Sequence, residues 1–328
     1  MRQPRRMRRS NASVLLAVAI GLAAIPRSSA LATEEAIPID VVGGRILVHV
    51  DPGGLPVPRE ILVAWITTAG RAVASYYGRF PVRQAEIQVL TGTPGKISQG
   101  HTADGHALIR LAVGRDTTAE DFSRDWVMTH EMVHLAHPSL EEDYAWFAEG
   151  VATYVEPIAR VQVGALEADE VWKWLLFGLP KGLPGSGDRG LDHTHTWGRT
   201  YWGGALYCLL ADLEIREQTA NRRSLADALR GIVAAGGNVE SGWTLARTLA
   251  VADQALGENL HVLSELHRNM GERPFAVNLE DLWRRLGVAY VDGRIVYDDQ
   301  APLASIRRSI TRSSSTRRAL AAPARRRR

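Results

Sequence analysis

Two histidines and a glutamate form a His-Glu-x-x-His quintet, from His130 to His134, within the apolar stretch DWVMTHEMVHLAH. On a helix these histidines project from one face, one turn apart, so both imidazoles can reach a single zinc ion. Glu131 lies beside them, too displaced to be the natural third ligand yet near enough to take a proton from water at the metal. The pattern is typical of a metal site that activates water. The alternative is a core helix that happens to carry polar residues.

A hydrolytic zinc site needs a third protein ligand and one open position for water. Glu149 follows His134 by fifteen residues, in the stretch WFAEGVATY. A short turn and one antiparallel helix would bring Glu149 opposite the two histidines, and the small residues Gly150 and Ala152 would let that helix approach the first one closely. Weaker candidates lie just beyond the first helix, where capping or solvated surface roles are the ordinary expectation: Glu141, Glu142 and Asp143.

The elements before residue 119 alternate between strand and helix patterns. Strands are expected over residues 44–50, 85–92 and 106–114, because short apolar runs there are bounded by turn residues. A helix is expected over residues 58–78, starting after a proline. The sequence therefore predicts a small mixed sheet with one covering helix.

Helical patterns dominate from residue 119 onward. Residues 118–137 are expected to form one helix, which opens on a Thr-x-x-Asp capping pattern and ends with His137 near its last carbonyl groups. A second helix over 140–161 follows a very short turn and must pack back antiparallel on the first. The Gly- and Pro-rich segment 178–198 is expected to be a long surface loop of the kind that borders sites. Further helices are expected over 201–219, 224–236, 241–256 and 278–287, and a hairpin with an Asp-Gly turn over 288–297.

The charge of the chain is unevenly distributed. The formal net charge is +3, but residues 1–32 carry six arginines and residues 301–328 carry nine, with no acidic residue in either. Because these ends hold 15 of the 39 basic residues, residues 33–300 keep 24 against 36 acids, a net charge of −12. The folded body is therefore not expected to bind nucleic acid, which requires a clustered basic face. A single cysteine, Cys208, excludes an intrachain disulfide.

Both ends differ from the body in composition. Residues 1–32 have the pattern of an export signal, with a positive region, 14 apolar residues and a small-x-small cleavage site ending at Ala32. The expected location is the periplasm or the extracellular medium. An uncleaved anchor is the minority alternative, since a membrane span needs about 20 apolar residues. Residues 301–328 are expected to be a disordered tail, either simply solvated or in contact with anionic lipid or polysaccharide at the cell surface. The predicted organisation is thus a signal peptide (1–32), an N-terminal α/β lobe (33–118), a helical zinc-binding lobe (119–300) and this tail.

Two helices of the chain resemble the metal-binding helices of the gluzincin metallopeptidases, particularly their peptidase MA-like branch. The matching motifs are His130-Glu131-x-x-His134 and Trp146-x-x-Glu149-Gly150-x-Ala152-x-Tyr154. The later run 200–230 is similar to the segment that follows the site in the glycyl aminopeptidase family. The resemblance covers roughly residues 119 to 235.

The resemblance implies an α+β fold with a thermolysin-like gluzincin catalytic core, in which a small mixed β-sheet lobe precedes a mainly helical lobe. It implies one Zn²⁺ ion held by His130, His134 and Glu149, with Glu131 as general base and acid. In these relatives a tyrosine on the later helix stabilises the tetrahedral oxyanion, and Tyr201 occupies the matching place. The implied activity is the hydrolysis of peptide bonds in a peptide or protein substrate.

Several alternatives stay open. Aminopeptidase relatives carry a Gly-rich acidic motif on the strand beside the site, which residues 104–114 do not match, so aminopeptidase action and endopeptidase action on an extended peptide paired with that strand are both compatible with the sequence. His193, His195 and Arg199 lie in the loop before Tyr201 and could bind the substrate carboxylate or the oxyanion. A non-catalytic exported protein for binding or envelope assembly could keep zinc for structure. Glu131 speaks against that class, because a structural site usually closes its fourth position with a protein ligand.

Overall fold

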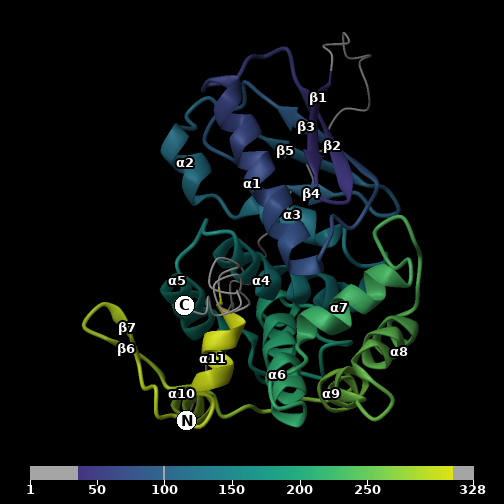
Figure 1. Cartoon of the computed structure of the whole chain (residues 1–328), viewed down its shortest axis with the longest axis vertical. Coiled ribbons are helices and arrows are strands. Elements are labelled where there is room, and N and C mark those ends of the chain that lie inside the picture. Colours follow the sequence, from purple (N-terminus) through teal and green to yellow (C-terminus); the bar gives the residue numbers. More distant parts are fainter. Residues whose placement is uncertain (1–35, 99, 313–328) are drawn as a thin grey trace, which may run out of the picture. The chain divides into compact units, whose positions relative to one another are not determined.

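The computed structural model of the protein describes residues 36–98 and 100–312 (Figure 1). The predicted signal peptide and residues 313–328 of the predicted tail lie outside these residues. A five-stranded mixed sheet comes first, with the strands in the order β1-β2-β3-β5-β4. They are β1 (Ile37–Val41), β2 (Gly44–Val50), β3 (Gln84–Leu90), β4 (His101–Thr102) and β5 (Leu108–Ala112).

Helix α1 (Arg59–Tyr77) covers one face of this sheet (Figure 1). Alternate residues of the strands are buried, such as Ile87 and Val89 of β3, because successive side chains of a strand point to opposite faces. Strands β2 and β3 are parallel, and parallel neighbours need a crossover, which α1 supplies. The predicted mixed sheet with one covering helix is confirmed, and α1 starts after Pro58 as expected.

The expected single helix over 118–137 is wrong, because the segment forms two helices, α2 (Ala119–Arg124) and α3 (Val127–His134). Asp125 has an extended backbone, with ψ 140°, and ends α2. Its Oδ2 accepts hydrogen bonds from the backbone N–H of Met128 at 3.2 Å and from Nε1 of Trp65 at 3.2 Å. Asp125 therefore satisfies an N–H group in the first turn of α3 and ties that helix to α1.

Helix α4 (Ala145–Gln162) follows α3 after a 3₁₀ turn, Glu142–Tyr144, and packs against it. Gly150 lies in the contact of α4 with α6 (Gly204–Gln218). The sequence predicts instead that Gly150 lies in the contact with α3. A Cβ atom at Gly150 would lie 2.4 Å from the backbone of Gly204. Two facing glycines thus let the backbones of α4 and α6 touch.

Apart from a C-terminal helix described below, two helices and two strands of the structure have no counterpart among the expected elements: α5 (Ala168–Gly178), α9 (Val262–Met270), β1 and β4. The remaining elements lie close to where the sequence predicts them: α7 (Leu225–Ala234), α8 (Leu245–Leu256), α10 (Leu279–Leu286), β6 (Val288–Val291) and β7 (Arg294–Tyr297). In the hairpin, Asp292 and Gly293 have φ of 49° and 82°, as a two-residue turn between strands favours. No helix in the described part of the chain has both the length and the hydropathy needed to cross a membrane.

The predicted tail begins too early, because residues Ala304–Ile310 form helix α11. Ile306 and Ile310 are buried, and the guanidinium of Arg307 donates to the carbonyl oxygens of Leu286 and Gly287 at 2.9 and 2.8 Å. The Ser- and Arg-rich composition hides apolar side chains that recur at helical spacing. Residues 304–310 therefore belong to the folded body.

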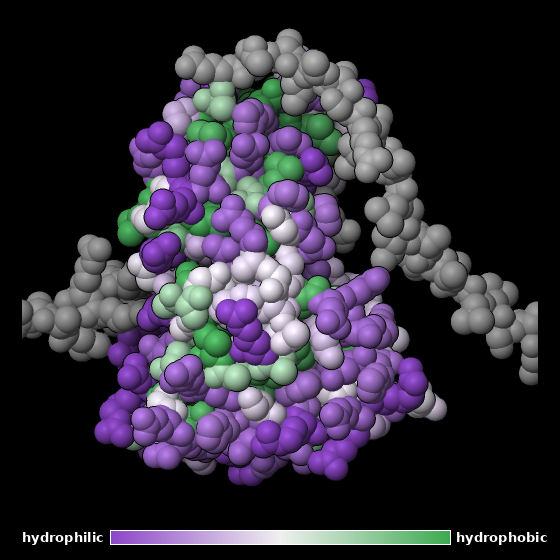
Figure 2. Space-filling view, turned by 90° about the vertical axis from the view of Figure 1, so that its right-hand side faces the viewer, coloured by the Kyte–Doolittle hydropathy of each residue, from purple (hydrophilic) through white to green (hydrophobic). Residues whose placement is uncertain are grey.

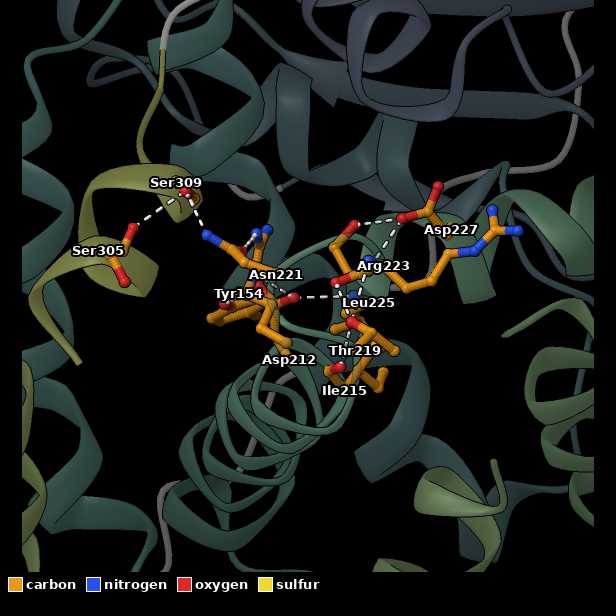
Figure 3. A network of polar contacts seen from close by, with 12 residues as sticks. Tyr154, Asp212, Ile215, Thr219, Asn221, Arg223, Leu225, Asp227, Ser305 and Ser309 are labelled. Atoms are coloured by element: carbon orange, nitrogen blue, oxygen red, sulfur yellow. Dashed lines mark hydrogen bonds and ion pairs between the residues drawn. The ribbon is translucent and has the colours of Figure 1, made fainter. Parts of the chain in front are cut away.

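A polar network links α11 and three further helices (Figure 3). Asp212 of α6 accepts from the Tyr154 hydroxyl of α4 at 2.9 Å and from the backbone N–H of Leu225, at the start of α7, at 2.8 Å. The amide of Asn221 donates to Ser309 of α11 at 2.7 Å. Buried carboxylates need such partners, so the network fixes how these helices meet. The face shown in Figure 2 is mostly hydrophilic, and its apolar residues form small groups.

Candidate metal centre

Three side chains converge where α3 faces α4. One ligand atom each of His130, His134 and Glu149 lies within 4.8 Å of the other two. The Oε2 atom of Glu149 lies 3.1 Å from Nε2 of His130 and 3.6 Å from Nε2 of His134. The spacing on α3 and the antiparallel return of α4 thus bring together the residues that the sequence singles out. Glu141, Glu142 and Asp143 are exposed and lie outside this group.

The donor set fits a catalytic zinc ion. Two imidazole nitrogens and one carboxylate oxygen match a known three-ligand set for zinc sites that keep an open position. Burial alone would raise the pKa of Glu149, but its hydrogen bonds with His130 and His134 outweigh burial and lower it. The carboxylate is therefore in the charged form that metal binding requires.

His137 orients one of the two histidines. Its Nε2 lies 3.1 Å from Nδ1 of His134, and its Nδ1 lies 3.0 Å from the carbonyl oxygen of Pro138. Because a carbonyl only accepts, Nδ1 of His137 carries the proton, so in the neutral ring Nε2 accepts from Nδ1–H of His134. Burial lowers the pKa of His137 to about 4, which keeps the ring neutral. Nε2 of His134, which lies on the side of Glu149, is thus the nitrogen left to bind a metal ion. The sequence predicts that His137 contacts the carbonyl groups that end the helix. In the structure it instead links His134 to Pro138 through these two hydrogen bonds.

Glu131 is held from the side of the sheet. Its Oε2 and its main-chain oxygen lie 2.8 and 2.9 Å from the hydroxyl of Thr102, on the edge strand β4. Gly100 leaves room for the side chain, since a Cβ atom there would lie 2.4 Å from Cγ of Glu131. The strand beside the site is therefore β4. The sequence predicts instead that residues 104–114, which include β5, lie there. Neither Gly100 nor Thr102 is among the predicted site residues, and a two-residue strand gives no periodic signal that could reveal them.

Tyr201 lies in one turn of π-helix, Gly198–Gly203, that leads into α6. Its ring stacks on that of His130, with centroids 6.3 Å apart. Burial and the neighbouring Glu149 raise its pKa, so the phenol keeps its proton at neutral pH and can donate a hydrogen bond. π-Helical turns are frequent at functional sites. The structure thus brings Tyr201 to the same place as the three ligand side chains.

The loop before Tyr201 does not bring its basic residues to the site. Arg199 is buried, and its Nε lies 2.8 Å from Oδ2 of Asp188. His195 lies 3.8 Å from Asp143 at the surface. Neither these two basic residues nor His193 lines the cavity in front of the metal ligands. Contact of these three residues with a substrate in the cavity, which the sequence leaves open, is therefore not supported by this arrangement.

A cavity of about 850 Å³ opens in front of the ligands. Glu131, Tyr201 and all three ligand side chains line it. Aromatic side chains form part of its wall and are also exposed at the surface: Trp126, Trp174, Phe177 and Trp197. The site is thus open to a ligand much larger than water, with apolar surface beside the polar groups.

No model of a protein family matches the sequence, and no curated protein matches it. Solved structures are similar in fold. The chain is similar to an aminopeptidase N family protein from Idiomarina loihiensis, with 15% identity, a TM-score of 0.60, and 77% of this chain and 49% of that chain covered. It is also similar to a two-domain M1 zinc metallopeptidase variant bound to L-arginine (16% identity, 74% and 53% covered, TM-score 0.48) and to an M1 zinc metallopeptidase from Deinococcus radiodurans (16%, 74% and 54%, 0.46). The chain spans about half the length of these proteins. The first similarity confirms the predicted α+β fold, in which a small mixed sheet precedes a mainly helical lobe.

Proposed function

We propose that the protein is an exported zinc-dependent metallopeptidase that hydrolyses peptide bonds. The observation that carries this proposal is the convergence of His130, His134 and Glu149 in a cavity that Glu131 and Tyr201 also line. The fold shared with an aminopeptidase N family protein supports it. Export rests on the signal pattern of residues 1–32.

The ligand side chains would hold one zinc ion, which when bound supplies a Lewis acid that polarises a carbonyl group and acidifies water. Glu131 takes the proton of the attacking water and delivers it to the leaving amine. Thr102 keeps one oxygen of the Glu131 carboxylate in place. Tyr201 donates its hydroxyl hydrogen to the oxygen that gains charge on the carbonyl carbon. These groups come from four elements, β4, α3, α4 and the π-helical turn before α6, so the fold must be intact for the chemistry to occur.

A polypeptide is the substrate that this cavity fits best. Strand β4 is at the end of the sheet, so within the described residues its outer edge has no strand partner. An extended peptide can pair with such an edge and present its carbonyl group to the cavity. Both an aminopeptidase and an endopeptidase can use this geometry, and a library of free and N-acetylated peptides separates the two.

The variant Glu131→Gln tests the mechanism. It should keep zinc, because the ligands are unchanged, and lose peptide cleavage by about 10²- to 10⁴-fold, since no base remains to take the proton. Zinc content by atomic spectroscopy and cleavage of a peptide library, with and without chelator, measure the two. Glu142→Gln is the matched control, because Glu142 also lines the cavity but is exposed. Full activity in Glu131→Gln with zinc bound would refute the mechanism, and zinc without any chelator-sensitive cleavage in the unmodified protein would favour a structural zinc protein.

A further inference from the structure

Exposed apolar side chains of this protein gather in one region. Eight large hydrophobic side chains are exposed in the described part of the chain, and four of them line the cavity: Trp126, Trp174, Phe177 and Trp197. Three more belong to the β6–β7 hairpin: Tyr290, Val291 and Val296. Only Val42 lies elsewhere, in the turn between β1 and β2. Exposed apolar surface gathered in this way marks an interaction site more often than scattered residues do.

Helix α5 connects the cavity with the hairpin. Trp174 and Phe177 are about one turn apart on α5, and the ring of Phe177 contacts that of Tyr290, with centroids 4.9 Å apart. Tyr297 of β7 donates its hydroxyl hydrogen to Asp169 of α5 at 2.7 Å, which holds the hairpin on this helix. Tyr290 and Tyr297 lie on the face of the hairpin toward α5, whereas Val291 and Val296 lie on the opposite face, because successive strand residues point to opposite faces. We call Trp174, Phe177 and Tyr290 the aromatic strip. These three residues are between 40% and 49% exposed.

The hairpin also offers backbone groups. Strands β6 and β7 form a sheet of two strands, so within the described residues no third strand pairs with either. Unpaired N–H and C=O groups of an edge strand are a template for another extended chain. Figure 1 shows the hairpin extending away from α10 and α11, where a chain can reach it.

We propose that the aromatic strip binds an extended, apolar segment of a polypeptide substrate, outside the part of that substrate that is cleaved. This inference rests on the proposed peptidase function. The strip starts inside the cavity, since Trp174 and Phe177 line it. A chain that leaves the cavity along α5 therefore meets Tyr290 next. A second copy of the protein or a lipid surface would cover the hairpin without needing this continuity.

The length of the strip sets the size of the substrate. One turn of α5 rises about 5.4 Å, and the rings of Phe177 and Tyr290 lie 4.9 Å apart, so the strip runs roughly 10 Å from Trp174 to Tyr290. An extended chain covers that distance in about three residues, so a peptide of about twelve residues is long enough to occupy the cavity and to reach Tyr290.

The experiment compares cleavage of three peptides that share one cleaved sequence: a short peptide, a twelve-residue peptide with aliphatic and aromatic residues at one end, and the same long peptide with serines at those positions. The unmodified protein should cleave the long apolar peptide with a kcat/KM about tenfold above that of the serine peptide. In Phe177→Ser and in Tyr290→Ser, this ratio should fall toward one. Val291→Ser/Val296→Ser is the matched control, because it removes two exposed valines from the face of the hairpin that points away from α5. Phe177→Ser keeps the test valid if Tyr290→Ser alters folding, which thermal unfolding shows.

Binding to Glu131→Gln, measured by fluorescence anisotropy of the labelled long peptides, separates this proposal from the proposed function. Preference for the apolar peptide that depends on Phe177 and Tyr290, without cleavage of any peptide by the unmodified protein, supports the strip and refutes the peptidase. Equal cleavage and equal binding of the apolar and serine peptides overturns the strip and leaves the peptidase standing. A dimer in sedimentation, or binding to lipid vesicles, that is lost in Phe177→Ser and Tyr290→Ser also overturns the peptide as occupant.

Discussion

At the scale of single residues, His137 is the group whose role depends most on one contact. It accepts from Nδ1–H of His134 and donates to the carbonyl oxygen of Pro138. His137→Ala should weaken zinc binding about 10- to 100-fold, because it frees the ring of His134 to rotate and to change tautomer. His137→Gln should restore part of the affinity, since its amide oxygen can take the place of Nε2 as acceptor. Competition with a chromophoric chelator measures both, and equal losses in the two variants would contradict the role assigned to this contact.

Gly100 makes a second prediction about a single residue. A Cβ atom at this position would overlap Cγ of Glu131, so Gly100→Ala must displace the carboxylate or the strand that carries Thr102. We expect a loss of about 10- to 100-fold in kcat with little change in zinc content, because a misplaced base is costly even when the metal ligands are intact. Gly185→Ala is the control, since no heavy atom lies within 4 Å of a Cβ atom there. Unchanged kcat in Gly100→Ala would show that Glu131 does not need this space.

Whether a residue of the site could be predicted depends on how far apart in the sequence it and its contact lie. His130, His134 and Glu149 could be predicted, because helix geometry fixes the first two and a short antiparallel return constrains the third. Thr102 and Gly100 could not, since they meet Glu131 across about thirty residues through a strand too short for a pattern. Arg199 could not be assigned correctly either, because the sequence does not reveal that Asp188 pairs with it in the interior.

At the scale of elements, Asp125 decides where α3, the helix with the proposed zinc ligands His130 and His134, starts. Its carboxylate is close to Met128 and Trp65, and burial raises its pKa to about 6 from 3.8. A raised pKa means that the protonated form is favoured in the folded protein. The contribution of this group to stability is therefore fully present below pH 3.8 and is lost as pH rises through about 6.

The variant Asp125→Asn tests this sign, because an amide oxygen keeps the acceptor and removes the titration. Between pH 4 and pH 7, the free energy of unfolding of the unmodified protein should fall relative to that of the variant by about 1–3 kcal/mol. Urea unfolding at both pH values, with chelator present so that metal binding does not contribute, measures the difference. A constant difference, or one of opposite sign, would show that Asp125 is not held in this way.

Missed elements have a common cause. Helix α5 buries Val171, Trp172 and Leu175 and exposes Trp174 and Phe177, so apolar side chains occur all around it and the helical period is masked. The boundary between α2 and α3 is hidden for the opposite reason, since the apolar period continues through Asp125. The carboxylate of Asp125 accepts from a backbone N–H group and thereby interrupts the helix. Elements with one clean apolar face, such as α7 and α10, lie close to their predicted bounds.

At the scale of the whole molecule, helix α11 sets the end of the folded body. Truncation after Arg312 should leave the melting temperature almost unchanged, because residues 313–328 are mostly Ser, Ala and Arg and offer little apolar surface to bury. Truncation after Leu303 should cost about 3 kcal/mol or more, since it uncovers the apolar surface against which Ile306 and Ile310 pack and leaves two main-chain oxygens without Arg307. Differential scanning calorimetry of both truncations measures this. Equal melting temperatures would show that α11 contributes nothing to the body.

The contact between Gly150 and Gly204 has a consequence for how the whole molecule controls its chemistry. Glu149 directly precedes Gly150, and Tyr201 precedes Gly204 by about one turn, so the metal ligand and the phenol are mounted on either side of one backbone contact. At this contact no side chain lies between the two backbones to absorb a small tilt. The distance between the Glu149 carboxylate and the Tyr201 hydroxyl therefore changes whenever α4 tilts against α6. Substitutions that tilt α4 against α6 from a distance should alter the reaction rate before they alter the melting temperature.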